Sequence, residues 1–201
     1  MIQKINIDAA YNPHNETSCL AKEQYVPVYN VINELLSPTS VADLGCRVGH
    51  LITLFKEKNN IDVLGVDYFQ WNKDAADNLI KDQFLVHDLR DPLKLEKTYD
   101  VVVSTEVGEH IDKAYSVAYL ENIKSVMTKT SRLVMTWAPG VPCDQHLNPL
   151  ERADFFNHMQ SNGFNLKDEL TSKAVSLAAE YGVFNTFHWY HTGNLSVWQL
   201  A

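Results

Sequence analysis

The sequence predicts an α/β fold with a mostly parallel, seven-stranded sheet and helices on both of its faces. From residue 40 onward, short apolar runs typical of buried strands alternate with stretches of helical periodicity, as in consecutive βα units. Glycine or acidic residues follow the first four of these runs. An open parallel sheet binds ligands beyond the carboxyl ends of its strands, where these residues would lie. The 201 residues suffice for one well-cored domain and are few for two, so we expect a single domain.

The first expected βαβ unit spans residues 41–66. An apolar run predicts a strand at residues 41–44, which ends at Gly45. Apolar residues at helical spacing then predict a helix at residues 50–58. A second buried strand is expected at residues 61–66, directly before an aspartate.

The middle of the chain continues this alternation. A helix is expected at residues 72–81 and a short strand at residues 84–86, before a turn that contains proline. The run at residues 99–104 is rich in β-branched residues and has polar residues on both sides, which makes it the clearest strand. The following stretch, residues 114–128, has helical character.

The last third of the chain carries weaker patterns. A strand at residues 132–137 is expected to stop before Pro139, because proline cannot donate a hydrogen bond to a sheet. A helix is expected at residues 149–162, with Gly163 in position to form a left-handed cap. The remaining expected elements are a helix at residues 172–181 and strands at residues 164–166 and 195–200.

Charge and composition disfavour several partners. The formal net charge of -8 repels polyanions, so nucleic acid is a less favoured partner. No run approaches the ~20 apolar residues that a membrane span needs, and the polar start lacks a signal peptide. We therefore expect no membrane partner and a cytoplasmic location. The three cysteines are widely spaced, which suits neither a disulfide framework nor a cysteine-based zinc site.

Polar residues end the first four expected strands. Residues 43–49 read Asp-Leu-Gly-Cys-Arg-Val-Gly after the first strand, while Asp67, Asp88 and Glu106 follow the next three. This combination resembles the class I S-adenosylmethionine-dependent methyltransferases, which have a Rossmann-like fold, over roughly residues 41–137. Each piece is weak alone, but their agreement in order and spacing supports the resemblance.

The resemblance implies that S-adenosylmethionine is the cofactor. Glycines let the backbone approach the ligand closely, and the start of the following helix presents N–H groups to its carboxylate. By the family pattern, Asp67 accepts hydrogen bonds from the ribose hydroxyls, Asp88 accepts one from the adenine amino group, and the Leu89 backbone contacts the adenine ring. The expected cofactor-binding residues are Asp43, Gly45, Cys46, Gly49, Asp67, Tyr68, Asp88, Leu89, Thr105 and Glu106.

Arg47 is the main departure from the family motif, whose middle glycine it replaces. Its side chain could crowd the amino-acid part of the cofactor or reach the cofactor carboxylate, and both alternatives stay open. Arg47 and His50 also occupy two glycine positions of the dinucleotide fingerprint, which argues against an NAD-dependent oxidoreductase. The lost glycine leaves a non-catalytic, cofactor-binding module of the same fold as another alternative.

The segment after the fourth strand, Glu106 to Ile111, resembles the family segment Glu-Val-x-Glu-His-Ile that borders the substrate cavity. Glu106, Glu109, His110 and the later His146 could converge as a metal-binding set of oxygen and nitrogen ligands. A similar set binds a divalent ion in methyltransferases that act on the 2′-hydroxyl of small RNAs. We favour the simpler interpretation, an acidic turn beside a rim histidine, and assign no metal. His110, as general base, and Glu109 are the expected catalytic residues.

The expected organisation is one methyltransferase domain over residues 1–201. Residues 1–38 form a cap or lid with a helix at residues 22–36, residues 39–140 form the cofactor-binding core, and residues 141–201 form the acceptor side. The expected function is methyl transfer to an unidentified acceptor, with a small molecule ahead of RNA. The alternative acceptor is RNA, in a metal-assisted 2′-O-methyltransferase.

Aromatic residues near the C-terminus allow two interpretations. They could line an apolar acceptor pocket, or they could pack in the core, which is the commoner role of such clusters. The residues concerned are Phe184, Phe187, His188, Trp189, Tyr190 and His191.

Overall fold

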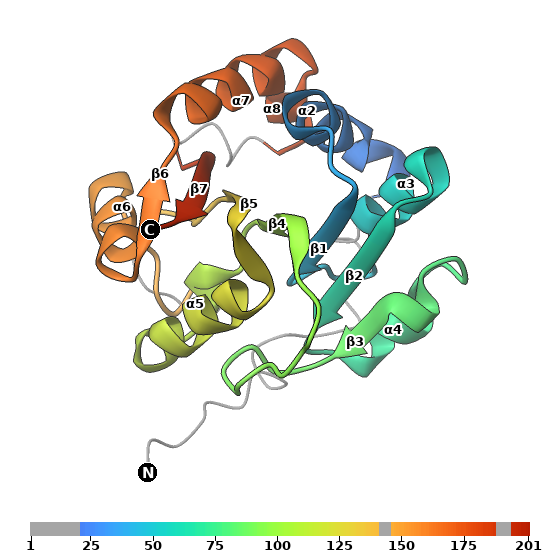
Figure 1. Cartoon of the computed structure of the whole chain (residues 1–201), viewed down its shortest axis with the longest axis horizontal. Coiled ribbons are helices and arrows are strands. Elements are labelled where there is room, and N and C mark those ends of the chain that lie inside the picture. The colour runs from blue at the N-terminus through green and yellow to red at the C-terminus, as the bar shows by residue number, and fades with distance from the viewer. Residues whose placement is uncertain (1–20, 141–145, 188–193) are drawn as a thin grey trace.

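A seven-stranded sheet runs through the centre of the molecule in the strand order β3-β2-β1-β4-β5-β7-β6 (Figure 1). The computed structural model describes residues 21–140, 146–187 and 194–201. Strands β1 to β5 pair in parallel, whereas β7 is antiparallel to both β5 and β6. The expected mostly parallel sheet is thus confirmed. The strands are β1 (Ser40–Leu44), β2 (Asp62–Asp67), β3 (Phe84–Val86), β4 (Tyr99–Ser104), β5 (Met127–Met135), β6 (Phe164–Leu166) and β7 (Ser196–Leu200).

Helices cover both faces of this sheet, and a separate apolar core lies under each layer (Figure 1). Helices α2, α3 and α7 pack over one face, and α5 and α6 pack over the other. The α-helices are α2 (Val26–Leu36), α3 (His50–Asn59), α4 (Gln70–Ala75), α5 (Ser116–Ser125), α6 (Arg152–Ser161), α7 (Asp168–Glu180) and α8 (Val183–Thr186). The short 3₁₀ helices are η2 (Lys22–Tyr25), η3 (Lys81–Gln83), η4 (Gly108–His110) and η5 (Lys113–Tyr115).

Two expected helices are shorter than their apolar patterns indicated. The helix expected at residues 72–81 ends at Ala75, because Ala76 is extended and the Asp77 carboxylate accepts a 2.9 Å hydrogen bond from the Leu79 backbone to form a turn. The buried Ile80 that suggested helical spacing packs from this turn instead. The helix expected at residues 114–128 gives way to β5, which begins at Met127 and pairs there with β4.

Other boundaries shift by a few residues. The strand expected at residues 132–137 is the end of β5, which stops at Met135. The helix expected at residues 172–181 begins four residues earlier, at Asp168, with two acidic residues in its first turn. Gly163 adopts the expected left-handed conformation after α6, with a φ of 81°.

The described part of the expected N-terminal cap is a helix of the layer that covers the sheet. Helix α2 packs against α3 and α7 and buries Val28, Tyr29, Val31 and Ile32. Residues 1–20, the rest of the expected cap, lie outside the described residues. The Tyr25 ring lies 5.7 Å from the His50 ring at the start of α3, so this layer reaches the turn after β1.

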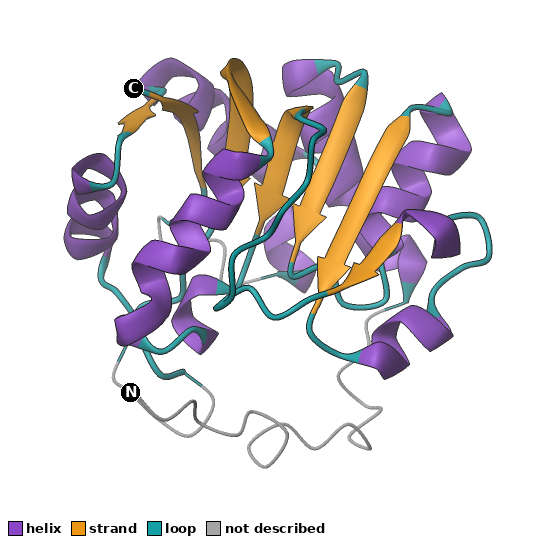
Figure 2. Ribbon diagram, turned by 60° about the horizontal axis from the view of Figure 1, so that its bottom comes forward, coloured by secondary structure: helices purple, strands orange, loops and turns teal. Residues whose placement is uncertain are grey.

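The carboxyl ends of the parallel strands meet at one edge of the sheet (Figure 2). Every expected cofactor-binding residue lies at or just beyond the end of β1, β2, β3 or β4. Within the described ranges, no helix has the length and apolar character needed to span a bilayer.

Candidate functional site

The turn after β1 is tightly folded around two glycines. Gly45 and Gly49 both have positive φ angles, 89° and 78°, which favour glycine. The backbone N–H of Gly45 donates a 2.7 Å hydrogen bond to the carbonyl of Val66, which fastens the turn to β2. A Cβ atom on Gly45 would lie 2.2 Å from the Val107 side chain. The turn therefore packs directly against the segment that follows β4.

Arg47 stands where the family motif has its middle glycine, and it adopts a left-handed backbone conformation with a φ of 51°. Its backbone N–H donates a 2.8 Å hydrogen bond to Oδ2 of Asp67, at the end of β2. The loss of the middle glycine thus leaves the shape of the turn intact. The Arg47 charge also lowers the pKa of Asp67, although burial raises that pKa by more.

The Asp67 carboxylate is held by donors on its other side as well. Oδ1 accepts hydrogen bonds from the Phe69 backbone, at 3.1 Å, and from Nδ2 of Asn72, at 2.7 Å. Asn72 is a buried side chain that sequence reasoning missed, and its polar character on the inner side of an expected helix was the available signal.

Asp43 lies at the end of β1 and is only 7% exposed. Burial raises the pKa of Asp43 to about 7, and the negative charge of Asp67 adds to this effect. Two buried carboxyl groups therefore lie at the ends of the neighbouring strands β1 and β2. Cys46, just after β1, is also buried, and burial raises the pKa of its thiol. These strand ends favour a cationic ligand.

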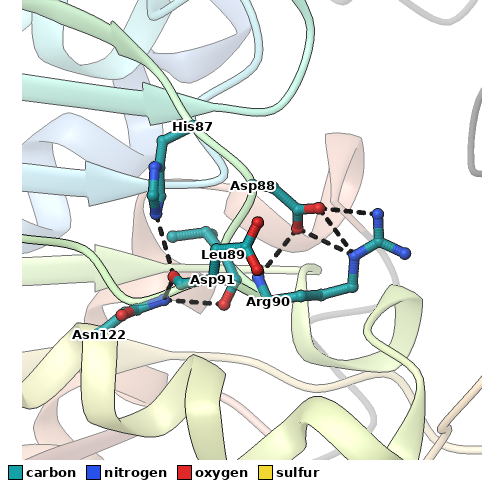
Figure 3. Close-up of polar contacts among 6 residues, drawn as sticks. All are labelled: His87, Asp88, Leu89, Arg90, Asp91 and Asn122. Atoms are coloured by element: carbon teal, nitrogen blue, oxygen red, sulfur yellow. Dashed lines mark hydrogen bonds and ion pairs between the residues drawn. The ribbon is translucent and has the colours of Figure 1, made fainter. Parts of the chain in front are cut away.

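Asp88, after β3, forms a two-pronged ion pair with Arg90 (Figure 3). Oδ1 accepts 2.9 Å hydrogen bonds from the Arg90 backbone and Nε, while Oδ2 accepts a 2.8 Å bond from Nη2. The guanidinium group lies 5.8 Å from the Tyr68 ring and 6.0 Å from the Tyr115 ring. No role for Arg90 was predicted from the sequence. The available signal was its position two residues after Asp88.

Asn122 on α5 fixes the loop that carries Asp88 and Leu89 (Figure 3). Its Nδ2 donates to the carbonyls of Leu89 and Asp91, at 2.8 and 2.9 Å, and its Oδ1 accepts from the Leu93 backbone at 2.7 Å. Leu89 is buried under this loop. The loop is therefore held by α5 before any ligand binds.

The segment after β4 begins with a strained residue. Glu106 has a φ of 56°, and its backbone N–H donates a 2.9 Å hydrogen bond to Oγ1 of Thr136. Burial raises the pKa of Glu106, and a hydrogen bond from Thr136 partly offsets this. Thr105, between the strand and Glu106, is partly buried. A non-glycine residue in this conformation is typical of a functional site.

Three expected residues come together at the rim beyond β4 and β5. The ligand atoms of Glu109, His110 and His146 all lie within 4.8 Å of one another. Nε2 of His110 is 3.8 Å from Oε1 of Glu109, and the two histidine rings are 4.9 Å apart. Burial raises the pKa of Glu109 well above its usual range, and the negative charge of Glu106 adds to this. Three of the four side chains of the alternative metal-binding set thus lie together, and Glu106 is not one of them.

The expected aromatic cluster near the C-terminus is only partly described. Phe187 is buried in the core and packs 5.3 Å from the Tyr25 ring, as the core interpretation expects. Phe184 packs against the same core. Residues 188–191, the rest of this cluster, lie outside the described residues.

Comparison with known families decides the identity of this site. A family model described as a methyltransferase domain matches residues 21–169. The chain belongs to the class I S-adenosylmethionine-dependent methyltransferases. A comparison with curated proteins finds no match.

Solved structures share the fold of this methyltransferase. An O-methyltransferase from a trans-AT polyketide synthase of Brevibacillus brevis, bound to S-adenosylhomocysteine, has a TM-score of 0.61 at 15% identity, covering 90% of this chain and 73% of its own. A TehB-like methyltransferase from Corynebacterium glutamicum has a TM-score of 0.59 at 20% identity, with coverages of 70% and 74%. The plantazolicin methyltransferase BpumL, with S-adenosylhomocysteine, has a TM-score of 0.57 at 15% identity, with coverages of 89% and 81%.

The strand ends of the methyltransferase carry charge that suits its cofactor. Gly45 is a position where a Cβ would collide with Val107, so the turn after β1 packs closely on the segment after β4. Asp43 and Asp67 supply negative charge, which suits a molecule with a sulfonium and an ammonium group. The adjoining rim, with Glu109 and His110, offers groups that can hold or accept a proton.

Proposed function

We propose that the protein methylates a small-molecule acceptor. The observation that best supports cofactor binding is the buried carboxyl pair of Asp43 and Asp67. Bound S-adenosylmethionine supplies an activated methyl group for displacement. Two acidic side chains at neighbouring strand ends have no obvious role in stability, because burial disfavours their charged forms. A cationic ligand offsets this penalty, which supports their role in binding.

Asp67 is proposed to bind the ribose. A carboxylate has about four acceptor positions, and the donors of Arg47, Phe69 and Asn72 use three of them. One direct hydrogen bond from a ribose hydroxyl therefore fits better than two. The protein donors fix the carboxylate in advance, which reduces the entropy lost on binding.

Asp88 and Leu89 are proposed to contact the adenine ring. Arg90 and Asn122 hold this loop from both sides, so its polar groups are oriented without a ligand. Tyr68 directly follows Asp67, and its ring lies 5.8 Å from the Arg90 guanidinium beside Asp88, so we propose that it contacts the nucleoside.

His110 is proposed as the group that accepts a proton from the acceptor. Its side chain is 37% exposed, whereas the neighbouring Glu109 is fully buried. Burial raises the pKa of Glu109, but when ionised its carboxylate, 3.8 Å away, stabilises the imidazolium that forms as the proton is taken. Displacement at an activated methyl group also gains much of its rate from positioning, so the contribution of the base is moderate.

The proposed acceptor is small and is not an RNA. The net charge of -8 opposes the approach of a polyanion. The similar structures include an O-methyltransferase of a polyketide synthase and a plantazolicin methyltransferase, whose names indicate non-nucleic-acid acceptors. RNA 2′-O-methylation stays the alternative outcome of a substrate screen. A cytoplasmic location stays a prediction.

Calorimetric titration with S-adenosylhomocysteine tests the cofactor site. Asp67→Asn should weaken binding at least tenfold, because the amide presents only one acceptor atom. Asp74→Asn, on the exposed side of α4, is the matched control and should bind as the parent does. No heat of binding for the parent protein would refute the proposal.

Labelled S-adenosylmethionine then identifies the acceptor. Purified protein should transfer label to a fraction of a metabolite pool and not to an RNA pool. His110→Ala should lower the rate about 10²-fold or more at neutral pH. Labelled RNA, or an unchanged rate in His110→Ala, would overturn the corresponding part of the proposal.

A further inference from the structure

Glu109 is a buried acid beside two histidines. Its side chain is 0% exposed. Neither oxygen of its carboxyl group has a partner in strict hydrogen-bond geometry among the described residues, although the Ala138 backbone and the Glu106 side chain lie close enough to shift its pKa. A buried carboxyl group of this kind takes up a proton, pairs with a cation or coordinates a metal, so a bound cation would stabilise the charged form of Glu109.

Two imidazole rings stand beside this carboxyl group. His110 follows Glu109 in η4, and His146 comes from the loop after β5, yet one ligand atom from each of the three side chains lies within 4.8 Å of the others. Nε2 of His110 lies 3.8 Å from Oε1 of the carboxyl group. The two rings meet edge to face, at an interplanar angle of 79°.

Backbone hydrogen bonds place His146 independently of any ligand. The Asn148 backbone N–H donates a 2.9 Å bond to the Glu109 carbonyl, and the Asn148 carbonyl accepts a 2.7 Å bond from Nε1 of Trp137. On the other side, a Cβ on Gly108 would lie 2.4 Å from the Trp137 ring, so η4 packs directly on that ring. Trp137 therefore supports both segments that bring the three side chains together.

We propose that Glu109, His110 and His146 bind a divalent transition-metal cation of the Zn²⁺ or Mn²⁺ type. One carboxylate and two imidazoles form a ligand set of borderline hardness, and this set recurs in catalytic metal sites that keep positions open. Ligand atoms about 2.1 Å from a tetrahedral metal lie about 3.4 Å apart. The observed separations need to shrink by no more than about 1.4 Å, which side-chain rotation can supply.

The cation site is independent of the proposed methyl transfer, because the cation binds without cofactor or acceptor. Its use does rest on the proposed function: with three protein ligands, the metal retains a position for an acceptor oxygen and lowers the pKa of a bound hydroxyl. His110 then acts as a ligand. Its proposed role as base belongs to the metal-free form, because a metal-bound nitrogen cannot accept a proton.

Calorimetry on the full-length, tag-free protein tests the site directly. After dialysis against a chelator, Zn²⁺ should bind with one equivalent, and Mn²⁺ more weakly. His110→Ala and His146→Ala should each lower the Zn²⁺ affinity at least tenfold. His87→Ala removes a histidine near the proposed adenine site and should leave that affinity unchanged.

Cobalt substitution gives a second readout. Co²⁺ should produce visible absorption bands that Glu109→Gln, His110→Ala and His146→Ala abolish. Circular dichroism and S-adenosylhomocysteine binding show that each variant is folded. Because those measurements do not use the metal, failure of the metal site is distinguishable from failure of the methyltransferase proposal.

Three results would overturn the inference. One is the absence of stoichiometric Zn²⁺ binding to the parent protein. Another is undiminished Zn²⁺ affinity in both His110→Ala and His146→Ala, which would place the bound cation elsewhere on the chain. A clear preference for Mg²⁺ over Zn²⁺ would likewise contradict nitrogen ligands.

Discussion

The backbone N–H of Arg47 donates a 2.8 Å hydrogen bond to Oδ2 of Asp67 and so joins the turn after β1 to the end of β2. The donor is a main-chain group, so a glycine at position 47 would make the same bond. What the arginine adds is its charge, which lowers the pKa of the Asp67 carboxyl group. Mutation of Arg47 can therefore remove the side-chain charge while keeping the main-chain hydrogen bond.

Replacing Arg47 should change the titration of Asp67 more than the fold. Arg47→Asn tolerates a positive φ and removes the charge, so the pKa of Asp67 should rise. Arg47→Lys keeps the charge and should leave that pKa close to the parent value. Carboxyl ¹³C NMR titration of Asp67 measures the difference. Equal pKa values in both variants would show that the arginine charge does not act on Asp67.

Gly45 should tolerate no larger residue. In Gly45→Ala the new Cβ would lie 2.2 Å from the Val107 side chain, in addition to the strain of a φ of 89°. We expect a loss of about 3 kcal/mol or more in the free energy of unfolding, measured by urea denaturation.

Two further variants separate the collision from the backbone strain. Gly163→Ala has a similar φ of 81°, but the nearest atom to its Cβ is the end of a lysine 3.8 Å away, so only about 1–2 kcal/mol should be lost. Adding Val107→Ala to Gly45→Ala should restore part of the lost stability. Equal losses for Gly45→Ala and Gly163→Ala would mean that the contact with Val107 is unimportant.

The strands and their acidic ends could be predicted because they depend on local patterns. The β-branched run at Tyr99–Ser104 and the spacing of Asp67 and Asp88 after their strands are visible in the sequence itself. The order in which these strands pair was not predicted and comes from the structure. The same patterns failed at Met127, because an apolar run after a helix suits a continued helix and a new strand equally well.

The supporting residues of the site could not be predicted in this way. Asn72, Arg90, Asn122 and Thr136 each act through a partner, and three of them belong to a different element from the residue they hold. Nothing in local periodicity reports a hydrogen bond between α5 and the loop after β3. Such contacts follow only once the strands are assembled.

Asp43 should make the ligand-free protein less stable as the pH rises. Burial raises its pKa from 3.8 to about 7, so the folded protein binds a proton that the unfolded chain releases near pH 4. The resulting stabilisation is fully present below about pH 4 and is lost as the pH rises through 7. A shift of about three pH units corresponds to at most about 4 kcal/mol.

Asp43→Asn should remove much of this dependence, because the amide stays neutral. We expect the variant to be more stable than the parent at pH 8 and similar to it near pH 4, in denaturation curves measured without cofactor. Asp82→Asn changes an exposed acid and serves as the control. A parent protein whose stability does not fall between pH 5 and pH 8 would contradict a neutral, buried Asp43.

Arg90 should matter for both stability and cofactor binding. Its side chain is 4% exposed and that of Asp88 is 16% exposed, so Arg90→Met leaves a shielded carboxylate without its cation. Removing one partner of such a pair costs about 3 kcal/mol. S-adenosylhomocysteine should bind about tenfold more weakly, because Asp88 loses the contacts that orient it toward the proposed adenine site.

The pair of Lys97 and Asp62 provides the comparison for Arg90. Its atoms approach to 3.2 Å, but the two side chains are 54% and 65% exposed, so solvent screens their attraction. Lys97→Met should change the unfolding free energy by less than about 0.5 kcal/mol and leave cofactor affinity unchanged. If Arg90→Met bound S-adenosylhomocysteine as tightly as Lys97→Met while losing stability, the ion pair would support the fold alone, and Asp88 would not need Arg90 to meet the adenine.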